Sequence, residues 1–452
     1  GWDEGEYGIK VYNTTGVKLE NVTVTAANAG IQVNSATVDL AGTITVSGNE
    51  FGGIEVCKSS NEGLSAGTLN IGSATIVCTD TAVPAIWIDG FTAAEGVVTG
   101  ADKLFAYQPD DVKDQIYYFT RLTKIGTATI PYGMTLTVDR LTVTGTLTVT
   151  GTLTVTGDLT VAEGGQITGN GTVTAPGYAK SGSNWVKLFD GGFGTETNPY
   201  QIATAEQFSN ISVLNAQMRD GTAYYFNQTA DLTLANNMLT AVDLNGTYNG
   251  NGYKISRSGI NGIYHIFDET FGENVIIKNF ELVEYSGRAL TVLNYNRAVN
   301  LTISDIDINS GDNAVVKVNS NNFGFVLSNA MWESWSDDYM SSGADTTQIP
   351  GKAQHIVFEN IANSVDVVNE GTCTGVIVGS GPCFSFEDTT VTYRDCTNAG
   401  TITGTEQVGF FYGNSAYIES VAVTSQFVVE KCSNRGTLSG TKADAQVDPC
   451  PG

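Results

Sequence analysis

A four-residue phrase recurs through the first ninety residues and decides the fold that we expect: Gly8-Ile9-Lys10-Val11, Gly30-Ile31-Gln32-Val33, Gly53-Ile54-Glu55-Val56 and, altered, Ala85-Ile86-Trp87-Ile88. Two more short apolar phrases follow the first three copies, so each repeat of about 22 residues carries three strands with alternating apolar residues. This pattern predicts coils of a parallel β-helix, a solenoid in which every coil packs on its neighbours. Ile9, Ile31, Ile54 and Ile86 should then stack in one interior column.

A six-residue period follows in residues 136–175. Leucines and valines recur six residues apart, with glycines at the corners: Leu141, Leu147, Leu153 and Leu159, then Val143, Val149, Val155 and Val161, then Gly145, Gly151 and Gly157. Such a period predicts tightly wound β coils. It fits either a right-handed solenoid or a left-handed helix of hexapeptide type. We favour the right-handed solenoid, because Thr flanks the apolar positions and the neighbouring coils are longer.

Composition shifts divide the chain into two segments. Residues 1–177 form an N-terminal β-solenoid, residues 178–198 are rich in Gly, Ser and Asn and are expected to be a linker, and residues 199–452 form a second solenoid. Within the first segment, residues 102–124 break the repeat and carry several aromatic residues. We expect them to form a loop or edge structure that covers a solenoid face and Trp87.

The second solenoid is expected to begin with one helix near residues 204–218. Thr204 and Gln207 have the spacing of a capping box, and Gly221 ends the pattern. The apolar residues between them fall on one helical face: Phe208, Ile211, Leu214 and Met218. A helix of this kind would cover the open apolar end of the solenoid.

Charge and composition exclude several functions. The 452 residues carry a formal net charge of −25, which disfavours nucleic acid and anionic lipid as partners. No apolar run reaches the roughly 18 residues of a membrane span. The two histidines, His265 and His355, lack ligand-spaced partners, so we expect no metal and no cofactor. We favour a monomer, although the residues do not determine the oligomeric state.

The seven cysteines match no zinc or redox signature. Cys396 and Cys432 occupy equal places in a repeat. Since equal positions of neighbouring coils lie close together, the two can either form a disulfide or stack as free thiols.

Five stretches from residue 194 onward resemble a known family. Residues 194–207 with 244–255 resemble the opening of bacterial cell-surface β-helix proteins, and residues 275–282 resemble their coil sequence. Cys396-Thr-Asn-Ala-Gly-Thr-Ile-Thr-Gly404 and Cys432-Ser-Asn-Arg-Gly-Thr-Leu-Ser-Gly440 resemble the GLUG-type repeats of those proteins. The resemblance covers about residues 194–441. It implies a right-handed parallel β-helix of pectin-lyase-like architecture in a secreted or surface-attached protein, often an adhesin.

Aromatic and acidic residues between two predicted coils are the strongest candidates for ligand binding. They are Trp332, Glu333, Trp335, Asp337, Asp338 and Tyr339. Aromatic planes beside carboxylates suit sugar rings, whose apolar faces stack while their hydroxyls donate to the acids. The alternative is a short helix that packs both tryptophans on a sheet. Trp87 is a further candidate, because it falls in an outward column.

Asp305 and Asp307 are weaker candidates for catalysis. They flank Ile306 on one predicted strand, and a polysaccharide hydrolase needs one carboxyl group as acid and one as base. An acidic protein also places Asp on solvent-facing positions without any catalytic role. The sequence therefore favours a non-catalytic surface protein that binds glycan or host matrix. A polysaccharide lyase or glycoside hydrolase of the pectin-lyase-like fold is the alternative.

Overall fold

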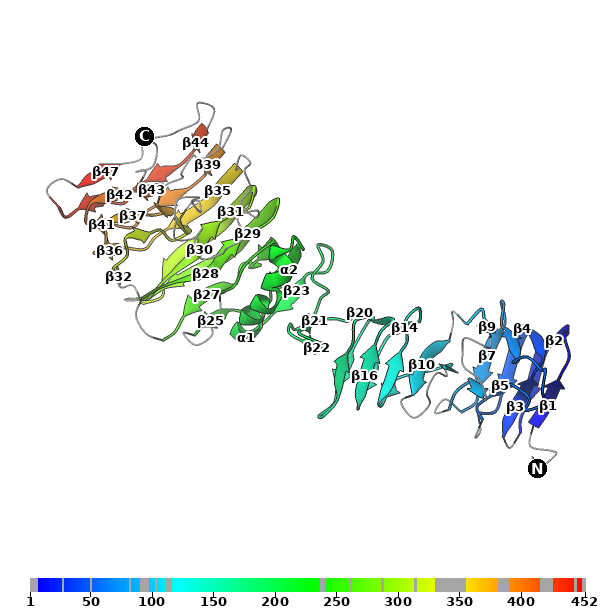
Figure 1. Ribbon diagram of the computed structural model, residues 1–452. Helices are drawn as coiled ribbons and strands as arrows, with labels where there is room; N and C mark the ends of the chain where they lie inside the picture. Colours follow the sequence, from blue (N-terminus) through cyan, green and yellow to red (C-terminus); the bar gives the residue numbers. More distant parts are fainter. Residues whose placement is uncertain are drawn as a thin grey trace. The chain divides into compact units, whose positions relative to one another are not determined.

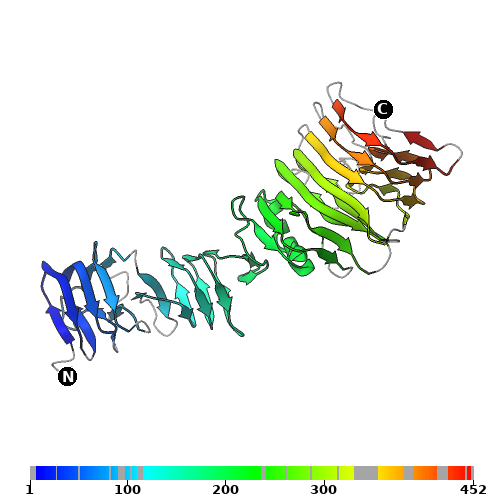
Figure 2. The ribbon, with the colours of Figure 1, turned by 180° about the vertical axis from the view of Figure 1, so that it is seen from behind.

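The computed structural model divides the chain into two compact units, Gly1–Lys187 and Leu188–Gly452. It describes residues 7–26, 28–48, 51–80, 83–89, 97–101, 104–109, 116–235, 241–259, 262–285, 288–312, 315–329, 355–380, 390–414, 426–442 and 445–448. Within these ranges the chain is all-β apart from one short helical region, and most paired strands are parallel (Figures 1 and 2). None of the described helices is both long and apolar enough to cross a membrane.

The first unit contains four sheets, and the largest runs through its whole length. In sheet order its strands are β1 (Tyr7–Tyr12), β3 (Ala29–Asn34), β5 (Ile54–Cys57), β8 (Ile86–Asp89), β11 (Tyr117–Phe119), β10 (Phe105–Pro109), β13 (Ala128–Ile130), β16 (Thr146–Val149), β19 (Gln166–Thr168), β22 (Asn184–Lys187) and β21 (Tyr178–Ser181). A second sheet holds β2 (Val17–Val24), β4 (Thr37–Val46), β6 (Thr68–Asn70) and β9 (Val97–Thr99), with β7 (Thr75–Cys78) also paired to β4.

The predicted isoleucine column is confirmed. Ile9 pairs with Ile31, Ile31 with Ile54, and Ile54 with Ile86, all in parallel register. The last three side chains are completely buried, and Ile9 packs against the same core from the edge of the sheet. Because alternate residues of a strand face opposite sides of the sheet, this register turns the apolar set of each repeat toward the core.

The hexad region forms three short faces. Besides β13, β16 and β19 of the large sheet, it has β12 (Lys124–Ile125), β15 (Leu141–Val143) and β18 (Leu159–Val161), and then β14 (Thr135–Val138), β17 (Thr152–Val155) and β20 (Thr172–Thr174). Leu141 pairs with Leu159 and Leu136 with Leu153, so the chain returns to the same sheet after about three hexads. Each hexad therefore supplies one side of a turn whose leucines and valines fill a second core.

Within residues 102–124, the described residues 104–109 and 116–124 do not form the loop over a sheet face that we expected. Their strands β10 and β11 pair antiparallel with each other and are inserted into the large sheet, between β8 and β13. Tyr118 and Ala106 belong to the first core, whereas Phe105 and Tyr107 pack against the second. The antiparallel pair of β10 and β11 thus joins two stacks of parallel strands. It can do so because alternate residues of β10 face opposite sides of the strand and reach different cores.

Part of the segment that we expected to be a linker is also folded. Residues 178–187 form β21 and β22, an antiparallel pair whose Trp185 lies opposite Ile167 of β19. Gly182 lies at the turn with φ +60, a conformation that favours glycine. The pair extends the large sheet by two strands at the end of the first unit.

The second unit is built around a twelve-stranded sheet. Its main path is β23 (Tyr200–Ile202), β24 (Tyr224–Gln228), β26 (Gly246–Asn249), β29 (Asn274–Glu284), β31 (Asn300–Ser310), β35 (His355–Asn363), β39 (Thr390–Arg394) and β44 (Gln426–Glu430). Off this path lie β25 (Leu232–Leu234), β27 (Lys254–Arg257), β40 (Thr397–Asn398) and β45 (Ser433–Asn434).

Three smaller sheets complete the second unit. One holds β28 (Gly262–Thr270), β30 (Arg288–Asn296), β34 (Leu327–Asn329), β38 (Val378–Ser380) and β43 (Tyr412–Asn414). The others hold β32 (Val316–Val318), β36 (Val367–Asn369), β41 (Ile402–Gly404) and β46 (Leu438–Gly440), and β33 (Asn322–Phe323), β37 (Cys373–Gly375), β42 (Gln407–Gly409) and β47 (Gln446–Asp448). Most pairs join strands from one repeat to the next.

The predicted helix near residues 204–218 is present, but it is divided into α1 (Ala205–Ser209), a 3-10 turn η1 (Asn210–Leu214) and α2 (Asn215–Arg219). Thr204 Oγ1 accepts a hydrogen bond from the amide of Gln207, as a capping box requires. The Gln207 side chain returns to the amide of Ala203, one residue before the expected partner. The four predicted apolar residues are buried, and the Phe208 ring lies 5.6 Å from that of Phe267 on β28.

Successive strands of the second unit bend at equivalent positions, and the residue at each of these bends has positive φ. Asn279, Asp305, Asn360, Asp395 and Lys431 all have φ between +51 and +63. Their preceding residues are paired from strand to strand, so the bends stack on one another. Asn and Asp adopt this left-handed conformation more readily than most other residues. The Asn or Asp residues at the first four positions are therefore explained by the positive φ that the bend requires.

A ladder of asparagines lies at a second turn, where Asn363 and Asn398 are buried and Asn434 is half-buried. Asn363 Nδ2 donates to Asn398 Oδ1 at 2.7 Å, and Asn398 Nδ2 donates to Asn434 Oδ1 at 2.8 Å. Each asparagine also holds its own turn, since its side-chain oxygen accepts from the amide two residues later. The ladder thus satisfies backbone groups that water cannot reach and fixes the register of three successive repeats.

We expect Asn398→Ala to destabilise the protein by about 2–4 kcal/mol, because it leaves the amide of Gly400 without its partner and removes one of the two bonds that Asn363 Nδ2 donates. Urea unfolding of the full chain measures the change. Thr401→Ala, at an exposed position close by, is the matched control and should shift stability by less than about 0.5 kcal/mol. Equal effects of the two substitutions would show that the ladder does not contribute to stability.

Candidate functional site

The strongest sequence candidates lie where the structure gives no description. Trp332, Glu333, Trp335, Asp337, Asp338 and Tyr339 fall within residues 330–354, outside the described ranges. The chain enters this segment after Asn329, at the end of β34, and leaves it at His355, where β35 begins. Their role in binding stays a prediction.

Trp87 is half-buried on β8. Its ring centroid lies 5.2 Å from that of Phe51 and 5.5 Å from that of Tyr117, so a residue of the 102–124 segment does pack on it. Glu55 is paired with Trp87 and accepts a hydrogen bond from Gln32 at 2.8 Å. Burial raises the pKa of Glu55, and the bonds from Gln32 and Tyr7 oppose that rise. A role of Trp87 in ligand binding stays a prediction.

Asp305 and Asp307 are both exposed on β31. Asp305 is one of the bend residues, with φ +55, and its carboxylate accepts hydrogen bonds from Asn360 Nδ2 and Ser304 Oγ, each at 2.9 Å. Its position and its contacts thus have a structural explanation in the stacking of bends. A catalytic role of the two carboxylates stays untested.

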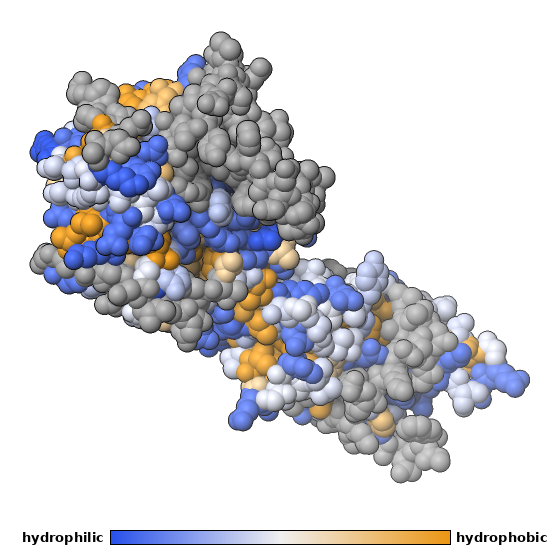
Figure 3. All heavy atoms as spheres, turned by 60° about the vertical axis from the view of Figure 1, so that its left-hand side comes forward, coloured by the Kyte–Doolittle hydropathy of each residue, from blue (hydrophilic) through white to orange (hydrophobic). Residues whose placement is uncertain are grey.

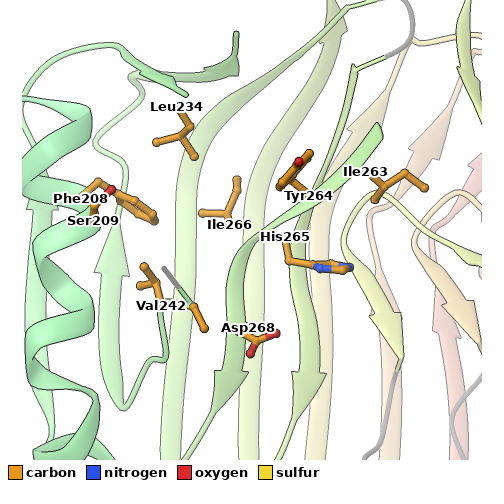
Figure 4. A pocket seen from close by; sticks show the side chains of 10 residues that line it. Phe208, Ser209, Leu234, Val242, Ile263, Tyr264, His265, Ile266 and Asp268 are labelled. Carbon is orange, nitrogen blue, oxygen red and sulfur yellow. The ribbon is translucent and has the colours of Figure 1, made fainter. Parts of the chain in front are cut away.

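The structure instead places a small cavity in the second unit, of about 250 Å³ (Figure 4). Its apolar lining comes mainly from α1, β25 and β28, with Phe208, Leu234 and Ile266. Polar groups are supplied by β28, above all His265 and Asp268. A mostly apolar hollow with a few fixed polar groups is the usual form of a small-molecule site.

Tyr264, which also lines the cavity, is held in place by a buried arginine. The Arg257 guanidinium lies 3.2 Å from the centroid of the Tyr264 ring, and its Nη1 donates to the carbonyl of Gly262. The charge of Arg257 also interacts with Glu284, which is fully buried. The two carboxylate oxygens of Glu284 share the amide hydrogen of Leu290. Burial raises the pKa of Glu284 well above its usual value, and the Arg257 charge opposes that rise. The Arg257 guanidinium thus packs on the Tyr264 ring and fixes its position.

His265 is the imidazole of the cavity. Its Nε2 lies 2.9 Å from Ser328 Oγ on β34, and which of the two donates depends on the tautomer. Burial lowers the pKa of His265 to about 4, against a weaker opposing effect of Asp268. The imidazole is therefore neutral at pH 7 and can donate one hydrogen bond and accept another.

Asp268 is the carboxylate of the cavity, and it accepts a hydrogen bond from Asn294 Nδ2 at 2.9 Å. Two more acids, Asp243 and Glu269, interact electrostatically with Asp268, but each forms an ion pair with an arginine. Arg219 Nε is 2.7 Å from Asp243 Oδ2, and Arg297 Nη2 is 2.6 Å from Glu269 Oε1. Burial raises the pKa of Asp243 and of Glu269, while the arginines oppose that rise.

The described lining of the cavity includes one carboxylate and one imidazole. A glycoside hydrolase uses two carboxyl groups across the scissile bond, whereas among the described residues Asp268 alone contributes a carboxylate to the cavity. The Ser328–His265 distance is that of a nucleophile and its base. However, Ser328 is only 3% exposed and does not line the cavity. Within the described ranges, no group of three or more His, Cys, Asp or Glu residues could hold a metal ion.

Sequence reasoning missed this site. His265 was considered only as a metal ligand, and Tyr264 and Asp268 were not considered. One signal was available: Asp268 and Glu269 directly follow the run Ile263–Phe267, in which apolar and aromatic residues flank His265. The partners that orient these residues, Arg257 and Asn294, come from other strands and could not be assigned from spacing.

Comparison with known proteins assigns no family. No family model matches the chain, and no curated protein matches it. One solved structure is similar, the crystal structure of a "putative immunoglobulin A1 protease" from Bacteroides ovatus. The sequence identity is 15% and the TM-score is 0.30, over 55% of this chain and 78% of that one. At that TM-score the similarity carries no argument about function.

We expect the neutral His265 to make stability depend on pH. Its pKa is about 4 in the folded chain and about 6.5 in the unfolded one, so acidification favours the unfolded state between these values. From pH 6.5 to 4.5 the wild type should lose about 2 kcal/mol more unfolding free energy than His265→Gln. Urea unfolding at both pH values measures this, with His355→Gln, at an exposed position, as control. Parallel losses in wild type and His265→Gln would contradict the assignment.

Proposed function

We propose that the chain is a secreted or cell-surface bacterial protein that binds glycan or host matrix without catalysis, as an adhesin does. In this proposal both units are right-handed parallel β-helices. Strands that recur once per repeat pair in parallel register, from Ile9 to Ile86 in the first unit and from β29 to β44 in the second. Nearly all crossover connections between parallel strands of one sheet are right-handed, which supports the proposed hand.

The GLUG-type repeats are part of the same proposal. Thr397 pairs with Ser433 and Ile402 with Leu438, so the two sequences that resemble these repeats lie in register. The asparagines Asn398 and Asn434 have the same place in both repeats and are bonded to each other. This structural equivalence supports a common repeat, and with it the resemblance to surface β-helix proteins.

The cavity around His265 and Asp268 is the observation that carries the binding proposal. An aromatic ring fixed by Arg257, a neutral imidazole and a single carboxylate lie around an apolar hollow. Sugar rings present apolar faces for such a surface and hydroxyls for such acceptors. A hollow of about 250 Å³ suits one terminal sugar unit better than a long chain segment.

We expect Asp268→Asn to weaken glycan binding by about 1–1.5 kcal/mol, because a hydrogen bond from a sugar hydroxyl to a charged acceptor becomes a weaker one to a neutral acceptor. A glycan array, followed by titration calorimetry on any ligand found, measures the loss. Asp307→Asn, an exposed carboxylate on β31, is the matched control and should bind as the wild type does. Unchanged affinity of Asp268→Asn for every ligand on the array would exclude the cavity as the site.

The insertion at residues 330–354 supplies a separate test. If Trp332 and Trp335 bind sugar, replacing both by Ala should cost roughly 1–3 kcal/mol of binding free energy per ring, with little change in melting temperature. A large fall in melting temperature with unchanged binding would mean that both rings pack in the core.

The alternative function is a polysaccharide lyase or glycoside hydrolase of the pectin-lyase-like fold. It predicts turnover of a polysaccharide that is lost in Asp305→Asn, Asp307→Asn or Asp268→Asn. Release of reducing ends or of unsaturated sugars from a substrate panel detects such turnover. Turnover by the wild type that is lost in any of these variants would overturn the proposal of a non-catalytic protein.

A further inference from the structure

The two cysteines of the paired repeats lie at equivalent positions of adjacent turns. Thr397 pairs with Ser433 directly after them, and the amide of Ser433 donates to the carbonyl of Cys396 at 2.9 Å. Adjacent parallel strands are about 4.8 Å apart, which falls within the roughly 4.4–6.8 Å between Cα atoms that a disulfide spans. Among the described cysteines, no other two occupy paired positions.

The two side chains also point the same way. Cys396 Sγ lies 3.3 Å from the carbonyl oxygen of Arg394, and Cys432 Sγ lies 3.5 Å from that of Glu430. Each thiol thus contacts the carbonyl two residues before it, so the side chains have the same orientation and stack. A hydrogen bond between the two thiols is the largest influence on the pKa of both. Both cysteines are free in the structure.

The turn that carries Cys432 is more exposed than the turn before it. Phe427, Val429 and Val447 are 40%, 39% and 37% exposed. Their partners in the preceding turn, Val391, Tyr393 and Val408, are at most 1% exposed. A segment with fewer buried apolar contacts opens locally at a lower free-energy cost. A covalent link here would therefore act on a less protected turn than its neighbour.

We propose that Cys396 and Cys432 are a disulfide-forming pair that ties this last described turn to the one before it. A small-molecule disulfide such as oxidised glutathione supplies the oxidising equivalent. The Cys432 thiolate attacks one of its sulfurs, releasing one glutathione thiolate, which takes up the proton that Cys432 lost. The sulfur of Cys396 then attacks the Cys432 sulfur of the mixed disulfide. The second glutathione leaves as a thiolate and takes up the proton that Cys396 loses, so one disulfide is exchanged for another.

The environments of the two thiols suit this order of steps. Cys432 is partly exposed, and the hydrogen bond from Cys396 lowers the pKa of Cys432 to about 7. Cys396 is completely buried, and the same hydrogen bond together with burial raises its pKa. A small disulfide therefore reaches Cys432 first, and Cys396 is placed to resolve the mixed disulfide.

The test is oxidation of the folded full chain with oxidised glutathione, followed by alkylation of the remaining thiols and tryptic digestion without reduction. Trypsin cleaves after Arg394, Lys431 and Arg435, which places the two cysteines in separate peptides, 395–431 and 432–435. We expect these peptides to be joined by a disulfide. Amides of residues 426–440 should then exchange with deuterium at least about tenfold more slowly than in the reduced protein.

Substitutions identify the pair. Cys396→Ser should leave Cys432 as a persistent mixed disulfide with glutathione, and Cys432→Ser should leave Cys396 unmodified. Cys373→Ser, a buried cysteine on β37 outside the pair, is the control and should leave the joined peptides unchanged. The proposal is overturned if folded wild-type protein retains both thiols free, keeps the mixed disulfide at Cys432, or joins either cysteine to a different one.

Discussion

The fold depends on the stacking of each residue on its equivalent one repeat later. The column from Ile9 to Ile86 stacks apolar side chains, and the ladder from Asn363 to Asn434 stacks amides that bond to one another. In both cases the same residue type recurs at the equivalent position of successive turns. Its packing or hydrogen bonding is favourable in each turn because the residues above and below it are of the same kind. The same rule places Cys396 beside Cys432.

This rule also explains which features could be predicted from the sequence. The isoleucine column followed from the repeated phrase alone, because register in a half-buried strand is fixed by which residues must face the core. The helical region at residues 204–218 followed from its apolar spacing. Its division by the 3-10 turn η1 did not, since spacing does not report where a helix changes its hydrogen-bond pattern.

Features that break the repeat were not predictable in the same way. The aromatic residues of 102–124 indicated a cover for a sheet face, but the antiparallel direction of β10 and β11 depends on pairing with β8 and β13. The cavity residues raise the same difficulty. Asp268 is oriented by Asn294 and His265 by Ser328, which are 26 and 63 residues distant in sequence. A constellation assembled across strands leaves no local pattern, whereas a stacked column repeats its pattern in every turn.

The direction of the backbone hydrogen bonds in the second unit has a mechanical consequence. These bonds join one repeat to the next, so they run along the stacking direction from β29 through β31, β35 and β39 to β44. A pulling force along that direction loads the interfaces between successive repeats in series, and each interface carries the full tension through the ladders of its several sheets. Added repeats would lengthen such a protein without strengthening it. The weakest interface would yield first, and the yield force would be set by the number of bonds in that one interface.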